Sequence, residues 1–183
     1  MIKLNLEIDD EKFELELPTG WDEISIKQYD EIVSLKQGGS TLMQFVNILK
    51  ILTKVDEDTI MAIPASEFQS ITDNLTFLQE TIEGNEDVES IMIGDEKFFL
   101  KKDFEQLTMG ESISIELIMK KYDNELSKAI PELLCIFLRK KKENGKLEGF
   151  KNSFMERAEM FSDLMIADVH KLFLFFSIGS PTS

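Results

Sequence analysis

The sequence predicts an α+β fold, predominantly α-helical, made of two similar halves that each consist of a β-hairpin followed by a helical bundle segment. Three observations lead to this prediction. Apolar and polar residues alternate in two pairs of short segments, which is the period of a half-buried strand. Apolar residues at helical spacing fill most of the remaining chain. The order of hairpin, bulky aromatic residue, acidic residue, helix cap and helix occurs twice.

The first predicted hairpin lies at the start of the sequence. Residues 2–8 and 13–17 alternate apolar and polar side chains on either side of the polar residues 9–12. Pro18 and Gly20 then stop the second strand.

A helix is expected to begin at Ser25. Ser25 and Gln28 have the spacing of a capping box, in which each side chain accepts a hydrogen bond from the backbone N–H of the other residue. Ile24 and Tyr29 have the spacing of a hydrophobic staple. The helix is expected to end at the glycine pair 38–39, because glycine favours a helix C-terminus.

Three more helices are expected in the first half. One follows Ser40 as its cap, and a short one begins at Asp56, where acidic residues favour a helix N-terminus. The short helix must end before Pro64, and another begins at Ser66. The polar residues 84–87 are typical of a linker. The sequence therefore predicts halves spanning residues 1–84 and 85–183, either as two domains or around one shared core.

The second half repeats the pattern of the first. Residues 91–93 and 98–100 predict a second hairpin, and Thr108 and Glu111 repeat the capping box. We interpret the repeated order as an internal duplication, with chance recurrence of common motifs as the alternative.

Further helices are expected at about residues 108–122 and 124–142. Pro131 either lies in an early turn of the second of these helices or delays its start. Residues 150–178 are expected to form one or two helices.

The net charge of −15 is unevenly distributed over the 183 residues. Residues 1–89 carry 20 acidic and 6 basic side chains. Such a surface repels phosphate groups, so binding to nucleic acid is not expected. Solubility alone is the alternative explanation of the acidic half.

Motifs of catalysis and cofactor binding are absent from the sequence. It has neither the glycine-rich nucleotide-binding patterns nor the zinc-protease and serine-hydrolase patterns. His170 is the only histidine, and Cys135, the only cysteine, lies in an apolar run where a thiol behaves as a small hydrophobe. We therefore expect a protein that is not an enzyme and that has no catalytic residues, no cofactor and no metal.

The sequence also predicts where the chain is made. Residues 1–8 have a strand pattern rather than that of a signal peptide. The longest apolar run, Leu172–Ile178, is far below the roughly 20 residues that span a bilayer. We therefore expect a cytoplasmic protein with no membrane contact.

Three features are candidate interfaces. The first is a basic run, which either meets an acidic partner or nucleic acid, or is the cationic end of a helix. The second is Trp21, which stacks in a partner's groove or plugs the local core. The third is an apolar run, which forms a buried helix or an oligomer interface. The residues of the two runs are Arg139, Lys140, Lys141, Lys142 and Lys146, and Leu172, Phe173, Phe175 and Phe176.

The segment from Leu17 to Tyr29, with Pro18, Trp21, Glu23 and Gln28 as its defining positions, resembles small proteins from the structural modules of tailed bacteriophages. The resemblance implies a component of a virion tail, neck or ring, or a tail-assembly chaperone. It implies no catalytic residues.

From these observations we expect a non-enzymatic viral structural protein, a tail or neck ring or connector component. It would act through contacts with other virion or assembly proteins as a homo- or hetero-oligomer. A tail-assembly chaperone and an acidic regulatory or inhibitory binding protein are the alternatives. The resemblance places the protein in the host cytoplasm during synthesis and in the tail or neck of the virion afterwards.

Overall fold

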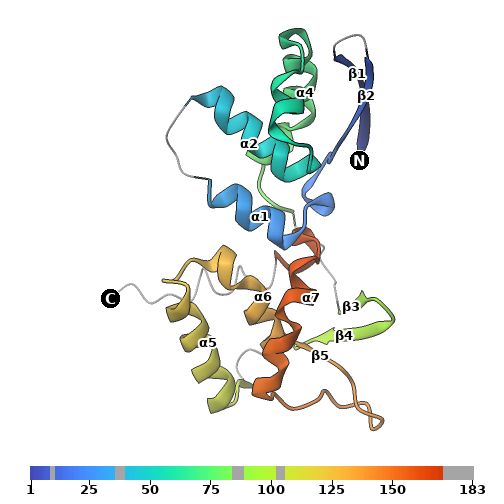
Figure 1. Ribbon diagram of the computed structural model, residues 1–183. Helices are drawn as coiled ribbons and strands as arrows, with labels where there is room; N and C mark the ends of the chain where they lie inside the picture. Colours follow the sequence, from blue (N-terminus) through green and yellow to red (C-terminus); the bar gives the residue numbers. More distant parts are fainter. Residues whose placement is uncertain (9–10, 36–39, 84–88, 102–105, 171–183) are drawn as a thin grey trace. The chain divides into compact units, whose positions relative to one another are not determined.

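A computed structural model describes residues 1–8, 11–35, 40–83, 89–101 and 106–170 (Figure 1). The fold is α+β and predominantly helical, as the sequence predicts. The chain divides into two units. The first unit comprises Met1–Glu83 with Met165–Ala167, and the second comprises Gly84–Leu164 with the residues from Asp168 onward. The three residues 165–167 were expected in the second half but belong to the first unit.

The first unit begins with the predicted hairpin. Strands β1 (Ile2–Ile8) and β2 (Glu11–Leu17) are antiparallel, with Leu6 opposite Phe13. One face carries the buried side chains of Leu6, Leu15 and Leu17. The strict alternation of the sequence therefore places one apolar face on the core of this unit.

Helix α1 (Ile26–Val33) begins where the capping box predicts. The hydroxyl oxygen of Ser25 accepts a hydrogen bond from the Gln28 N–H at 3.2 Å, and the Ser25 N–H donates to Oε1 of Gln28 at 3.1 Å. The amide nitrogen of Gln28 also donates to the carbonyl oxygens of Ile51 and Leu52. Gln28 therefore also connects α1 to the last turn of the next helix by hydrogen bonds. The expected end of this helix at residues 38–39 was wrong, because α1 ends at Val33, where Ser34 is the C-cap and its N–H donates to the carbonyl oxygen of Asp30.

Five helical elements follow α1 within the described residues 40–83. Helix α2 (Thr41–Thr53) follows Ser40, whose side chain makes no capping hydrogen bond. Helix α3 (Glu57–Met61) is capped by Asp56, which accepts from the Thr59 N–H at 2.9 Å. The helix expected at Ser66 begins as a 3-10 turn, η2 (Ala65–Glu67), and continues as α4 (Phe68–Asn74). A further 3-10 turn, η3 (Thr76–Gln79), ends the series.

The second unit begins with the second predicted hairpin. Strands β3 (Ser90–Ile93) and β4 (Glu96–Leu100) are antiparallel, and Ile93 pairs with Glu96 across the turn residues Gly94 and Asp95. A third strand, β5 (Leu138–Arg139), pairs with β4, so that this sheet has the order β3-β4-β5. The sequence did not predict the third strand.

Two helices follow the hairpin of the second unit. Helix α5 (Met109–Lys121) is capped by Thr108 with the second predicted capping box. Helix α6 (Leu126–Phe137) contains Pro131 near its middle. The prediction of a helix to residue 142 was wrong, because α6 ends at Phe137 and the next two residues pair with β4. Sheet pairing outweighs the helical pattern of the sequence there.

Short helical elements complete the described chain. They are the 3-10 helix η5 (Asn152–Arg157), α7 (Ala158–Ser162) and the helical residues 166–170. The predicted helices of residues 150–178 are therefore observed as far as residue 170, and the rest lies outside the described residues. Just after α7, Met165 forms an isolated antiparallel β-bridge with Ser25, and the Ile166 N–H donates to the carbonyl oxygen of Ile24 at 2.8 Å.

Both units have the predicted order of hairpin, capping box and helix. The described part of the first unit holds a two-stranded sheet, however, whereas the second unit holds a three-stranded one. A duplication of the chain stays a prediction. Among the described residues, none of the helices combines the length and apolar character needed to cross a membrane.

Candidate functional site

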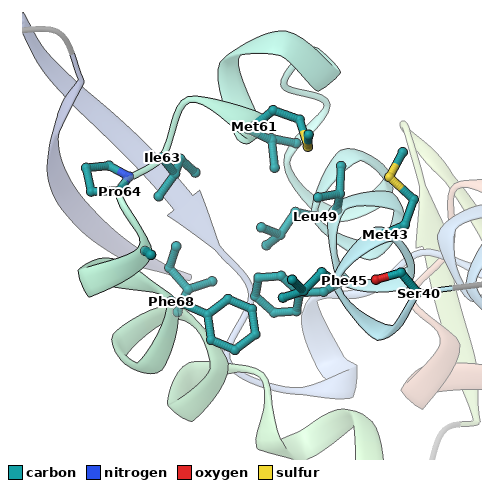
Figure 2. Close-up of a pocket in the computed structure, with 13 residues that line it drawn as sticks. Ser40, Met43, Phe45, Leu49, Met61, Ile63, Pro64 and Phe68 are labelled. Carbon is teal, nitrogen blue, oxygen red and sulfur yellow. The ribbon is translucent and has the colours of Figure 1, made fainter.

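The first unit contains an apolar groove of about 590 Å³ (Figure 2). Residues from α2 line one side of it, and residues from α3, η2 and α4 line the other (Figure 2). Its lining is Ser40, Leu42, Met43, Phe45, Val46, Leu49, Ile60, Met61, Ile63, Pro64, Ala65, Phe68 and Ile71. Because Ser40 is the one polar side chain in this set, the groove favours an apolar occupant.

The local sequence explains the shape of the groove. In α2, Leu42, Phe45 and Leu49 recur at helical spacing and therefore share one face. Pro64 cannot continue α3, so the chain turns and brings α4 alongside. The rings of Phe45 and Phe68 meet with centroids 4.6 Å apart. This aromatic pair joins the two sides of the groove.

The groove has a buried floor and an exposed margin. Leu49 and Ile71 are each 1% exposed, so their side chains belong to the core of the unit. Leu42 and Met61 are 61% and 62% exposed, and Met43 is also exposed. Large apolar side chains exposed around an apolar groove are typical of a surface that binds another protein.

Several acidic residues lie on the short helices that form the groove. Lys50 of α2 forms an ion pair with Glu57 of α3. Asp58 is exposed and Glu67 is half-buried. Asp56 caps α3, and the hydrogen bonds from Thr59 lower the pKa of its carboxyl group. The charge near the groove is therefore mainly negative, which favours a partner with basic residues beside its apolar ones.

Trp21 does not line the groove. It opens the 3-10 helix η1 (Trp21–Glu23), and its ring makes edge-on contacts with Tyr29 and Phe77. Its Nε1 donates a hydrogen bond to the carbonyl oxygen of Glu80 at 3.2 Å. Of the two roles expected for Trp21, these contacts agree with packing in the local core.

Arg139 is not a surface residue, which corrects its place among the candidate interface residues. Its side chain is 1% exposed, and its Nη2 donates to Oε1 of Glu111 at 3.0 Å. Its guanidinium carbon lies 4.9 Å from the ring centroid of Phe150 and 5.2 Å from that of Phe154. The strand pairing of β5 turns this side chain inward.

The remaining lysines of the run belong to a hairpin, so the interpretation as a cationic helix end was wrong. In this basic hairpin (residues 140–147), Lys141 pairs with Leu147, and the Lys142 N–H donates to the carbonyl oxygen of Lys146 at 2.8 Å. Lys140 forms an ion pair with Glu96. Lys141, Lys142 and Lys146 are exposed. The surface available to an acidic partner is therefore this loop.

The second unit holds a buried network of charged groups that the sequence did not predict. Glu111 accepts hydrogen bonds from Lys101 at 2.7 Å and from the Thr108 N–H at 2.8 Å. Burial raises the pKa of Glu111, but these hydrogen bonds outweigh burial and bring its pKa below the ordinary value. A similar balance lowers the pKa of Glu148, which pairs with Arg157 at 2.6 Å. In the sequence, the only indication of this network was Glu111, the acidic residue of the second capping box.

Neither Cys135 nor His170 forms part of a reactive arrangement in the described structure. Cys135 is fully buried, and burial raises the pKa of its thiol to about 12. Burial lowers the pKa of His170, whose Nδ1 lacks a hydrogen-bond partner. Within residues 1–170, excluding the undescribed gaps, no group of three potential ligands could hold a metal ion. Leu172, Phe173, Phe175 and Phe176 lie outside the described residues.

Comparisons of the chain with protein-family models, curated protein sequences and solved structures gave no match.

Proposed function

We propose that this chain is a non-enzymatic structural or assembly protein of a tailed bacteriophage that acts through protein–protein contacts. The observation that carries the proposal is the apolar groove of the first unit, with Leu42 and Met61 exposed at its margin. A groove of this kind between helices suits an apolar segment or an amphipathic helix of another chain. The resemblance around Trp21 supplies the viral context.

The basic hairpin supports the same proposal from the second unit. Its exposed lysines have the opposite charge to the acidic first half of the chain. Opposite charges steer association and fix orientation, although exposed pairs add little affinity. Apolar burial in the groove would therefore supply most of the binding free energy, and the lysines would set orientation and rate.

A tail-assembly chaperone is a second candidate, favoured by the methionines of the groove. Met43 and Met61 both line it, and both are exposed. Flexible methionine side chains adapt to differently shaped apolar segments, as a binder of several clients requires. A chaperone would leave before the particle is complete, whereas a structural component would remain.

The proposal can be tested by native mass spectrometry of the protein, alone and co-expressed with the products of the genes that flank its own. We expect either a homo-oligomer or a complex of fixed stoichiometry with a flanking product. The variant Leu42→Glu/Met61→Glu should reduce that assembly. The matched control is Leu117→Glu/Met92→Glu, because Leu117 and Met92 are 61% and 58% exposed in the second unit. A protein that stays monomeric in every combination would overturn the proposal.

If a complex forms, its location distinguishes the two candidates. Particles purified from infected cells should contain the chain if it is a structural component. Particles without it, from cells in which it binds a tail protein, would identify a chaperone.

A further inference from the structure

The groove sets strict chemical demands on its occupant. Polar groups buried against its apolar walls would lose hydrogen bonds to water, and only Ser40 in the lining could replace them. A cavity of about 150 Å³ holds one benzene ring. The groove, at about 590 Å³, therefore has room for several large apolar side chains.

The chain carries a segment with this chemistry. Residues 172–178, here called the apolar segment, are apolar at every position except Ser177. Leu172, Phe175 and Phe176 have the i, i+3, i+4 spacing by which an amphipathic helix places its anchors in a groove. The segment follows residues 166–170, which are helical, with only Lys171 between.

Charge near the groove agrees with such an occupant. Asp58 and Glu67 lie on the helical elements that form the groove, and neither forms an ion pair in the described structure. Lys171 immediately precedes the apolar segment. A basic residue beside the apolar anchors would therefore be attracted to the acidic residues on α3 and η2, which favours one orientation of the bound segment.

We propose that the apolar groove of one copy of this chain binds the apolar segment of a second copy. The inference rests on the proposed function as an assembly protein and names the partner of the groove. Groove and segment are different surfaces, so the contact is heterologous. Repeated from copy to copy, it closes into a ring or extends into a filament.

Complementation between two variants of the full chain tests the contact. The segment variant, Leu172→Ser/Phe175→Ser/Phe176→Ser, keeps an intact groove. The groove variant, Leu42→Glu/Met61→Glu, keeps an intact segment. By sedimentation velocity, wild type should form either a ring of fixed size or a filament that grows with concentration, and each variant alone should associate at least tenfold more weakly. An equimolar mixture should form one-to-one dimers and nothing larger, because each pair has a single intact groove and segment in contact.

A second measurement keeps the test independent of the stability of the variants. A fluorescent peptide of residues 170–180 should bind the segment variant, whose groove is empty of competing segments, and should bind the groove variant at least tenfold more weakly. The control variant Leu117→Glu/Met92→Glu should self-associate as wild type does. Circular dichroism checks that all variants are folded.

The outcomes separate this inference from the proposed function. Self-association that survives in the segment variant but fails in the groove variant would overturn the inference and leave the proposed function standing. If the wild type is monomeric and the mixture of the two variants forms no dimers, the inference that a second copy occupies the groove is also overturned. If a flanking gene product binds the groove of that monomer, the proposed function still holds. A groove variant that associates with every partner as wild type does would overturn both.

Discussion

Arg139 of β5 donates a hydrogen bond to Glu111 of α5 at 3.0 Å, and the two side chains are only 1% and 4% exposed. The contact joins the first turn of a helix to a sheet strand. Glu111 simultaneously completes the capping box with Thr108. Glu111, which the sequence identifies only as part of a helix N-terminus, therefore also neutralises the buried Arg139 of the second unit.

Removing the charge of Glu111 should destabilise the second unit more than removing Arg139. Glu111→Gln removes the carboxylate that pairs directly with the buried guanidinium of Arg139, which then keeps only the more distant charge of Glu148, and its Nη1 already lacks a partner. In Arg139→Leu, by contrast, Glu111 retains Lys101. We expect a loss of about 3–5 kcal/mol for Glu111→Gln, measured by urea denaturation. The double variant should lose less than the sum of the two single variants, and strict additivity would contradict the coupling.

The second unit should lose stability in acid through Glu111 and Glu148. Both carboxyl groups have pKa values below the ordinary 4.5 in the folded protein. Each therefore stabilises the fold fully above pH 4.5, and this contribution is lost as the pH falls through the lower folded-state pKa. Urea denaturation between pH 6 and pH 3 should show the decline. Glu111→Gln should make the decline shallower, and an unchanged slope would show that Glu111 does not titrate on unfolding.

The two capping boxes should contribute similarly to stability. Ser25→Ala and Thr108→Ala each remove the acceptor for an N–H group of the first helical turn, which should cost roughly 0.5–2 kcal/mol. Ser40→Ala is the matched control, because Ser40 occupies the same position before α2 without a capping hydrogen bond. Thermal unfolding should separate the two groups. A loss at Ser40 equal to that at Ser25 would show that the capping hydrogen bonds contribute nothing specific.

Cys135 should be unreactive in the folded protein. It is fully buried, and its thiol has a pKa of about 12, so almost no thiolate is available near pH 8. A thiol-specific chromogenic reagent should react slowly at pH 8 and rapidly after urea is added. Because the chain has one cysteine, the signal has one source. Fast reaction without urea would indicate local opening of α6.

The basic hairpin should affect the rate and salt dependence of assembly. Changing Lys141, Lys142 and Lys146 to Glu should weaken association most at low ionic strength, because salt screens exposed charges. Arg139 is left intact, since its loss would disturb the core. A control with the same change in charge replaces Lys12, Lys27 and Lys120, which are exposed elsewhere. If both variants sediment alike at two ionic strengths, the effect comes from net charge alone and not from the position of the hairpin lysines.

Several elements follow directly from local patterns in the sequence. The hairpins depend on alternation over adjacent strands, and the starts of α1 and α5 depend on side chains three residues apart. Such interactions are local, so a short stretch of sequence contains all the participating groups. The cap of α3 at Asp56 was predictable for the same reason.

The candidate site was much less predictable than these elements. The groove combines residues of α2 with residues of α3, η2 and α4, and each of these helices alone has an ordinary apolar face. Whether such a face is fully covered depends on how the helices pack. Periodicity therefore identified Phe45 and Phe68 as apolar helix residues, but it did not show that exposed margin residues surround a groove.

By itself the sequence determined the α+β class, both hairpins and the two capped helix starts, because contacts between near neighbours suffice for each. Tertiary structure alone decided that Leu138 and Arg139 leave the helical pattern. Their pairing with Leu100 and Phe99 satisfies backbone groups of β4, and it directs Arg139 toward Glu111. Pairing between residues so far apart in the chain depends on how the whole unit packs, which no local pattern of charge or hydrophobicity encodes.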